Sequence, residues 1–130
     1  MELSYAPGAC NIGPDEIARR RRVALVGLVL AIAMAVALLA VGAAGPVRLI
    51  VALPLTSAAI GWIQARRRFC MAYGLAGTFN LGAIGEMSRV SDRAALAADR
   101  RTSLIIAAQG IAVGLAGALL FLLLPFSIAA

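Results

Sequence analysis

The sequence predicts an all-α membrane protein with three transmembrane helices and a glycine-rich connector on the cytoplasmic face. Hydrophobic residues make up 62% of the 130 positions and the mean hydropathy is +0.95, which is more than a soluble domain of this size needs for its core. Charged residues make up only 14% and stand in short clusters between long uncharged stretches. We therefore expect a single integral membrane domain over residues 1–130.

The first span is predicted over residues 23–44. This stretch is dense in Val, Leu, Ile and Ala, and about 20 such residues cross the ~30 Å hydrocarbon core at ~1.5 Å per residue. It is too long for the ~7–15-residue hydrophobic region of a cleavable signal peptide, so we expect it to remain as an anchor. Cleavage near the small residues LAVGAAG at its far end is the alternative. Four arginines precede the span: Arg19, Arg20, Arg21 and Arg22.

The second span is predicted over residues 48–65. A Gly-Pro pair marks its start, and Trp62 marks a membrane border, where tryptophan is enriched. The span requires Arg48 to extend its guanidinium toward the headgroups. Pro54 lies inside the span and is expected to kink it, because proline lacks the N–H of a helical hydrogen bond. Three arginines follow the span: Arg66, Arg67 and Arg68.

Residues 66–101 are predicted to connect the second and third spans without crossing the membrane. The uncharged part, residues 69–85, contains four glycines, each of which lowers helix propensity by ~1 kcal/mol relative to alanine. With three spans, 11 of the 12 arginines fall on one side of the bilayer, whereas a fourth span would divide them seven to five. We therefore expect the connector at the cytoplasmic face, in the headgroup region or as a short re-entrant piece.

The third span is predicted over residues 102–124. Ser91 or Asp92 suits the N-cap of an alanine-rich helix, and this helix is expected to run directly into the span. Pro125 is expected to end it. Because the arginine-rich leader should face the cytoplasm, three spans place the C-terminus outside a bacterial-type inner membrane.

Two short motifs resemble each other, NIGPDE after Cys10 and NLGAIGE after Phe79. Asparagine bonds to the backbone two residues on and glycine permits a turn, so each motif is predicted to form an Asx turn that leads toward a helix. Because such turns are common, chance similarity is the simpler explanation of the echo. The candidate turn residues are Asn11, Gly13, Asn80 and Gly82.

Cys10 and Cys70 are the two cysteines, and both are predicted to be cytoplasmic. A disulfide between them is disfavoured in a reducing compartment. Cys70 follows three arginines, and nearby positive charge favours the reactive thiolate, so one hypothesis is a redox or sulfane-sulfur role for these thiols. The alternative is that Cys70 is a small buried hydrophobe, and that the arginines set the topology and bind anionic lipid headgroups.

The sequence predicts no catalytic, cofactor or metal site. It contains no histidine, so a Cys-His or Ser-His nucleophile cannot be built, and two thiolates would need further ligands from Asp15, Glu16 or Glu86 to hold a metal. Those carboxylates have no spacing that requires acid-base work, and no Walker-type phosphate loop is present. Nucleic-acid binding is not expected, because the arginines flank apolar stretches instead of lining a soluble face with aromatic residues.

Small residues recur at intervals of four in each predicted span. Gly110 and Gly114 form a GxxxG motif in the third span, and this spacing lets helices approach closely. We expect a tight bundle, with a homo-oligomer as a further hypothesis. The other members are Ala118 in the third span, Gly27, Ala31 and Ala35 in the first, and Ser57 and Gly61 in the second.

The N-terminal two thirds of the chain resemble a known family. NIGPDEIARR precedes the first span, and Cys70, Tyr73, Leu75 and Gly77 form a C-x-x-Y-x-L-x-G pattern after the second. Together, over roughly residues 11–82, these motifs look like the YgaP-like inner-membrane domain family, whose members are small two-helix hairpins of unassigned function. Some members are fused to a rhodanese domain, so the resemblance implies a sulfur-handling thiol at Cys70. This sequence differs by Met71 in place of the usual proline and by its third span.

These observations predict a small, non-enzymatic membrane scaffold or accessory protein. Its partners would be the lipid bilayer with its anionic headgroups, and a second copy or a larger membrane complex. A thiol-dependent protein that uses Cys70, with or without Cys10, is the alternative. An oligomeric transporter is a third hypothesis; Gln109 and Thr56 would have to line its path, because the spans lack the acids and bases usual in ion pathways.

Overall fold

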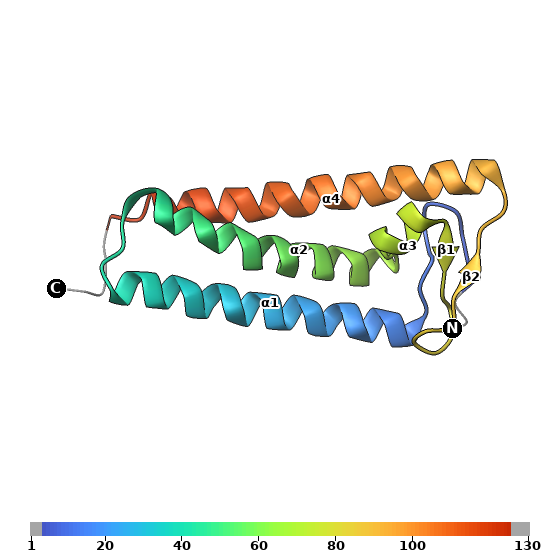
Figure 1. Cartoon of the computed structure of the whole chain (residues 1–130), viewed down its shortest axis with the longest axis horizontal. Helices are drawn as coiled ribbons and strands as arrows, with labels where there is room; N and C mark the ends of the chain where they lie inside the picture. The colour runs from blue at the N-terminus through green and yellow to red at the C-terminus, as the bar shows by residue number, and fades with distance from the viewer. Residues whose placement is uncertain (1–3, 126–130) are drawn as a thin grey trace.

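A computed structural model describes residues 4–125 and contains three long helices that lie side by side (Figure 1). It confirms the nearly all-α class. In chain order the elements are α1 (Pro14–Ala40), the 3₁₀ helix η1 (Gly45–Val51), α2 (Ala52–Arg67), α3 (Met71–Ala76), β1 (Thr78–Phe79), β2 (Ser88–Arg89) and α4 (Arg93–Leu122).

Three helical segments are long and apolar enough to cross a membrane. They are α1 with 27 residues, η1 joined to α2 with 23 residues, and α4 with 30 residues. Residues 69–85 contain no such helix, so the prediction of three spans, and not four, is confirmed for the described chain. At ~1.5 Å per residue, α1 and α4 are longer than the ~30 Å hydrocarbon core, so their polar ends extend beyond it.

The helix of the first span starts earlier than the apolar stretch does. α1 begins at Pro14, at the first helical position, where proline's missing N–H has no partner to lose. The four arginines before the predicted span are therefore helical, and they sit at fixed angles around α1. The helix ends at Ala40, so residues 41–44, expected in the span, form the turn into η1.

The second span differs from its prediction at Arg48 and Pro54. Arg48 does not extend to the surface: it is 4% exposed and donates to the backbone carbonyls of Ala43, Phe121 and Leu124. It thereby caps carbonyls at the C-terminal end of α4, which a helix leaves without internal partners. Pro54 was expected to kink the span from within, but it lies in the first turn of α2, directly after the 3₁₀ helix η1.

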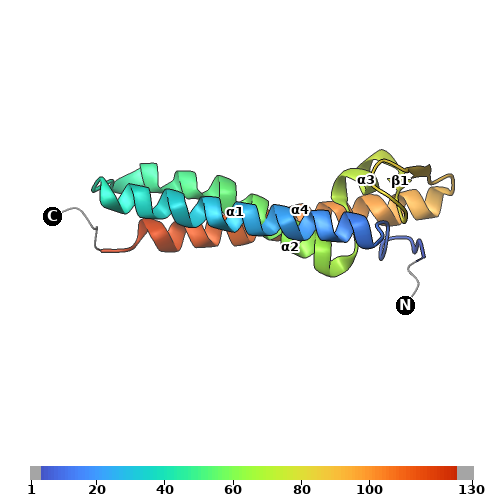
Figure 2. The same ribbon diagram turned by 90° about the horizontal axis from the view of Figure 1, so that it is seen from below.

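α2 lies between α1 and α4 and packs against both, whereas α1 and α4 make few direct contacts (Figures 1 and 2). The predicted small residues form both contacts. A β-carbon at Gly27 would lie 2.9 Å from the Ala58 nitrogen, and one at Gly114 would lie 2.9 Å from Thr56 Cβ. The GxxxG motif is therefore used inside the chain, between α4 and α2.

The end of the bundle near η1, called here the far end, has a core drawn from all three spans. Ala31, Val51, Ala118 and Phe121 are buried there. The Arg48 guanidinium lies 5.1 Å from the Phe121 ring centroid, in cation-π contact.

The opposite end carries the connector, which folds as a short helix followed by a small hairpin. β1 and β2 pair antiparallel, with Thr78 opposite Arg89. This ladder was not predicted. Asp92 then caps α4 by accepting a hydrogen bond from the Ala95 N–H at 2.9 Å, as expected, and the helix continues without a break through the third span.

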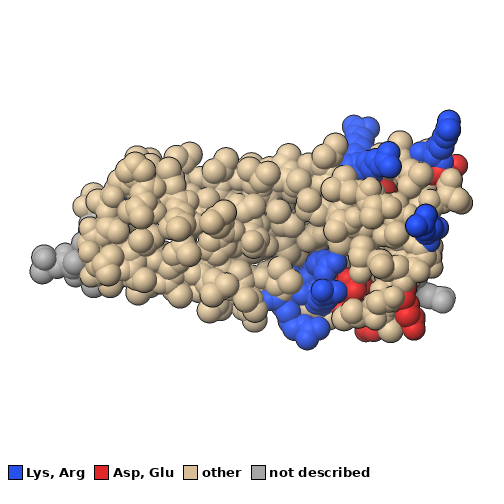
Figure 3. Space-filling view, viewed as in Figure 1, with Lys and Arg blue, Asp and Glu red and all other residues tan. Residues whose placement is uncertain are grey.

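Charged side chains gather at the connector end. Figure 3 shows arginines and acidic residues over one part of the molecule and an uncharged surface over the rest of that face. The described chain enters at the charged end and leaves at the far end (Figure 1). This arrangement fits an odd number of crossings.

Candidate functional site

The candidate site is the polar cap, defined here as residues 4–13, residues 68–92 and the adjoining ends of α1, α2 and α4. Eight polar or charged residues of the described chain are buried, and all of them except Arg48 lie in this region. Two further buried residues are its cysteines. The seven polar or charged residues are Asn11, Glu16, Gln64, Asn80, Asp99, Thr102 and Ser103.

Asn11 links the N-terminal segment to the start of α3. Its side-chain Nδ2 donates to the Cys70 carbonyl at 3.1 Å, and its Oδ1 accepts from the Cys70 N–H at 2.6 Å. Its backbone N–H donates to the Arg68 carbonyl at 3.0 Å. An amide is suited to this position because it donates and accepts at once.

The two similar asparagine motifs lie beside each other. The Asn80 N–H donates to the Asn11 carbonyl, and the Gly13 N–H donates to the Asn80 carbonyl, each at 2.9 Å. Gly13 has no room for a side chain, since a β-carbon there would overlap the Leu81 backbone. The echo in the sequence therefore coincides with a direct pairing in space.

The Asx turn prediction is right for one asparagine and wrong for the other. Asn80 Oδ1 accepts from the Gly82 N–H at 2.9 Å, as an Asx turn requires. Asn11 instead uses its side chain on Cys70, 59 residues away in the chain. The Asn11 side chain bonds to Cys70 and not to its own turn because the Cys70 N–H is buried, and leaving a buried N–H without a partner is costly.

Cys70 is 2% exposed and forms the N-cap of α3. Its neighbouring cation was predicted wrongly. Arg20 of α1, and not the arginine run before Cys70, places Nη2 2.9 Å from the Cys70 Sγ. The side chains of Arg66, Arg67 and Arg68 are exposed. The chain turns inward only after them, where Arg68 adopts a left-handed conformation (φ 56°) and Phe69 is buried.

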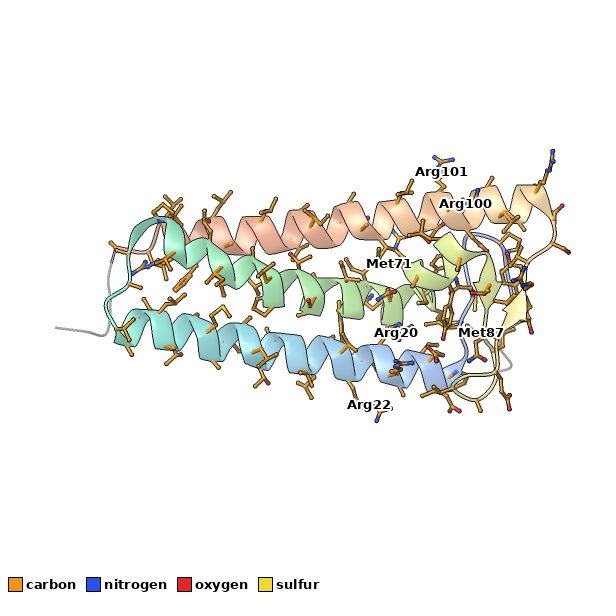
Figure 4. The ribbon with its side chains drawn as sticks, viewed as in Figure 1. Arg20, Arg22, Met71, Met87, Arg100 and Arg101 are labelled. Carbon is orange, nitrogen blue, oxygen red and sulfur yellow. The ribbon has the colours of Figure 1, made fainter. Side chains whose placement is uncertain are left out.

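Arg20 also pairs with a buried carboxylate. Its Nη2 lies 3.1 Å from Glu16 Oε2, and Arg19 Nη1 lies 3.8 Å from Glu16 Oε1. Glu16 is fully buried, so these arginines offset a charge that would otherwise be costly to bury. Figure 4 shows Arg20 directed from α1 toward α3, whereas Arg22 points outward.

Tyr73 completes this charged cluster. The Arg20 guanidinium lies 5.9 Å from the centroid of its ring. Burial raises the pKa of the Tyr73 hydroxyl, and the negative charge of Glu16 raises it further. Tyr73 thus stays protonated next to Arg20 and Cys70.

Cys10 is also buried but is held separately. Its Sγ lies 3.6 Å from the Ile12 carbonyl, to which it donates a weak hydrogen bond. Both cysteines are free thiols. The cap thus contains both candidate thiols, and no disulfide joins them.

Asp99 of α4 binds the N-terminal segment and was missed at the sequence level. Its carboxylate accepts from the Tyr5 hydroxyl and from the Gly8 N–H, each at 2.7 Å. Thr102 donates to the Gly8 carbonyl at 2.8 Å. Burial and the bond to Asp99 raise the pKa of the Tyr5 hydroxyl. More than 90 residues separate these partners in the sequence, so no local pattern could pair them.

Two more missed residues hold α3 in place. Gln64 of α2 accepts from the Met71 N–H at 2.9 Å, and Ser103 of α4 donates to the Met71 carbonyl at 2.9 Å. Gly74 of α3 then approaches α4 closely, since a β-carbon there would lie 2.9 Å from the Asp99 carbonyl. Gln64 is a polar side chain in the last turn of an apolar helix, and this position could have indicated a hydrogen bond to the connector.

The remaining candidates are dispersed. Thr56 packs against Gly114 between α2 and α4, while Gln109 is exposed and accepts from Arg67 at 3.2 Å. The chain by itself therefore does not bring Thr56 and Gln109 to one path. Asp15 and Glu86 are exposed, and within residues 4–125 no three acidic, cysteine or histidine side chains form a metal-binding group.

The C-x-x-Y-x-L-x-G pattern corresponds to one structural unit. Cys70 precedes α3, Tyr73 packs toward the buried cluster of the cap, and Gly77 ends the helix in a left-handed conformation (φ 75°) that suits glycine. The pattern therefore has a structural explanation that needs no chemistry at the thiol.

Comparisons with known proteins give no further assignment. No protein-family model matches the chain, and neither the curated proteins nor the solved structures include a match to it. The site must therefore be interpreted from its own geometry.

Proposed function

We propose that the protein is a small, non-enzymatic membrane scaffold or accessory protein. The observation that carries this proposal is that the spans and the cap differ in which groups they leave available for a partner. Apolar helix faces remain exposed along the spans, while the polar groups of the cap are mostly used up in holding the chain together.

The exposed faces are extensive. Leu53 and Leu120 are each 70% exposed, and many other large apolar side chains of α1, α2 and α4 exceed one third. Lipid tails can cover these faces, and so can a second copy or a larger membrane complex. The contacts between the helices of one chain use small residues, so the large apolar side chains on the outer faces remain available to partners.

The cap supports a structural role. Cys70 is enclosed, and its backbone N–H and carbonyl are both bound by Asn11. Such a network fixes the entry of α1 and α4 into the membrane. The outer surface of a cap held rigid in this way would serve as a docking site for a partner.

One observation favours the thiol hypothesis as a second candidate. An arginine nitrogen lies 2.9 Å from the Cys70 sulfur, and reactive cysteines are found beside cations of this kind. For that chemistry the cap would have to open, because the sulfur is shielded from solvent.

Thiol trapping in membranes separates these two functions. For a scaffold, Cys70 is expected to react slowly with a membrane-permeant maleimide, and an Ala72→Cys variant should react rapidly because Ala72 is exposed on α3. Rapid labelling of Cys70, or a persulfide there in native membranes, would favour sulfur chemistry. Cys10→Ser assigns the signal to one thiol.

The accessory role is tested by purification in mild detergent. We expect a companion at fixed stoichiometry, or a stable second copy. Crosslinks from photoreactive residues at Leu53 or Leu120 should map onto it. A monomer without crosslinks would contradict the proposal.

The proposed location is a bacterial-type inner membrane, with the cap in the cytoplasm and the C-terminus outside. The clustering of arginines at one end supports this orientation. Impermeant labelling of cysteines placed at Val90 and Leu124 tests it, because the two should react from opposite sides. Kinship with the YgaP-like family is part of the same proposal and rests on the motifs between Asn11 and Gly82.

A further inference from the structure

A lateral cleft runs along the bundle where α1 and α4 stay apart over α2. It has a volume of about 330 Å³ and an almost wholly apolar wall. All three spans contribute to it, and it opens sideways to the region of the lipid tails. The lining includes Leu25 and Leu28 of α1, Leu55, Ala58 and Ala59 of α2, and Val113 of α4.

A second cleft, of about 350 Å³, adjoins the first toward the cap. The two clefts share Arg21 and Trp62 in their walls, so they adjoin there, and the pair is called the depression here. The second cleft has a mixed lining that includes Arg66 and Arg68. The depression therefore changes from basic to apolar along the helix axis.

The three arginines at the mouth are not neutralised by the chain. Within residues 4–125 both ion pairs involve Glu16, with Arg19 and Arg20. The side chains of Arg21 and Arg68 form no hydrogen bond or ion pair there, and Arg66 lies over the Trp62 ring at 6.0 Å. All three are exposed.

We infer that this depression binds an anionic phospholipid. The phosphate and headgroup would lie among Arg21, Arg66 and Arg68, and one acyl chain would lie in the apolar cleft. Trp62, 53% exposed at the junction, stands where an amphipathic ring prefers the border between headgroup and tail. The order of charge and apolar surface matches that of a phospholipid from head to tail.

Charge selects this occupant over a transmembrane helix of a partner. A partner helix would bring an apolar face to the cleft and leave three cations against it without counter-charge, whereas a lipid phosphate supplies that charge. This inference does not depend on the scaffold proposal, since a lipid site can exist with or without a protein partner.

Trp62 is the sole tryptophan, so its fluorescence reports the cleft directly. The full-length protein is reconstituted in phosphatidylcholine vesicles that hold a minor fraction of phosphatidylglycerol, and in matched samples the acyl chains of one lipid or of the other are brominated. Quenching should show phosphatidylglycerol enriched about fivefold or more at Trp62 relative to its bulk fraction, which corresponds to ~1 kcal/mol, the contribution of a single arginine that contacts the headgroup. High salt should reduce the enrichment.

Matched variants assign the effect. R21Q/R66Q/R68Q should abolish the enrichment, while R93Q/R100Q/R101Q removes the same charge from exposed positions on α4 and should preserve it. Val113→Phe should narrow the apolar cleft and weaken the enrichment. Ile111→Phe, on an exposed part of α4 outside the cleft, should leave it unchanged. Circular dichroism checks that each variant remains helical.

Four results would overturn the inference. Equal quenching by the two lipids in the unmodified protein would show no selectivity. Enrichment that survives R21Q/R66Q/R68Q would place the site elsewhere. Protection of Trp62 from both lipids would show that protein covers the cleft. Loss of enrichment on adding soluble glycerol phosphate would identify a site for free phosphate.

Discussion

Along the spans, α2 meets its neighbours over glycine and alanine, whereas in the cap distant segments are joined by hydrogen bonds to named side chains. Gly27 and Gly114 act by leaving space, and a β-carbon on either would collide with α2. Asn11 and Asp99 act by accepting hydrogen bonds from backbone N–H groups of distant segments. Lipid tails are as apolar as leucine, so shape must hold the spans together, while the cap can use polar bonds.

The comparison also explains the different tolerance to change that we expect. A seam built on shape should respond to added volume and ignore charge. A network built on hydrogen bonds should respond to the loss of one donor or acceptor. Substitutions in the two regions should therefore differ in size of effect, and the largest effect is expected in the cap.

Asn11→Ala should destabilise the cap most. It removes two hydrogen bonds and leaves the buried Cys70 N–H without a partner, at ~1–3 kcal/mol for the unsatisfied group, whereas the Cys70 carbonyl keeps its bond from the Gly74 N–H. Hydrogen exchange at α3 and maleimide labelling of Cys70 should both accelerate. Asn80→Ala is the control, because it removes only bonds within the loop at Gly82 and Ala83 and should have a smaller effect. Equal effects would contradict the special role of Asn11.

Arg48→Met removes three hydrogen bonds from a charged donor, each of which contributes ~1.5–3 kcal/mol, and should lower the free energy of unfolding by about 2 kcal/mol once water replaces most of them. The expected loss is smaller than for Asn11 because carbonyls at the far end can reach headgroup water. Unfolding of the purified protein in mixed micelles measures it. Arg93→Met is the control and should be neutral. If Arg48→Met is also as stable as the original protein, the bonds from Arg48 to the carbonyls at the end of α4 contribute nothing to stability.

Gly114→Ala should cost about 1–2 kcal/mol, within the range for overpacking a tight contact. Its new methyl group would meet Thr56, including the α2 backbone at Cα, so the helices must separate slightly. Ala112→Val adds volume to an exposed face of the same helix and should be neutral. The same unfolding assay applies, and a neutral Gly114→Ala would show that the α2–α4 seam is loose.

The smallest effect concerns the two tyrosines at high pH. Because the pKa of each hydroxyl is raised in the folded protein, the unfolded chain loses these protons first as pH rises. Stability from this source is therefore complete below pH ~10, the ordinary tyrosine value, and declines above it. Tyrosinate absorbance should rise only above that pH in the folded state. Tyr5→Phe leaves Tyr73 as the remaining tyrosine signal, and titration at the ordinary value would contradict the model of a closed cap.

The cap shows where sequence reasoning is limited. Ser91 or Asp92 was predicted as a helix cap, and the structure selects Asp92, whose partner lies only three residues away. The Glu16 to Arg20 pair has i,i+4 spacing and could have been found by the same local rule. Arg20 at Cys70 and Asp99 at Tyr5 could not, because those contacts depend on how α3 and the N-terminal segment fold onto α4.

The sequence by itself determined the three spans, the non-spanning connector and the concentration of arginines at one end. Hydropathy and charge are properties of consecutive residues, and the bilayer acts on them segment by segment. Only the tertiary structure decided that Arg48 is buried, that Arg20 contacts the cysteine, and that a basic mouth opens into an apolar cleft. These features arise where helices far apart in sequence converge, so their free energies depend on packing geometry that no local pattern contains.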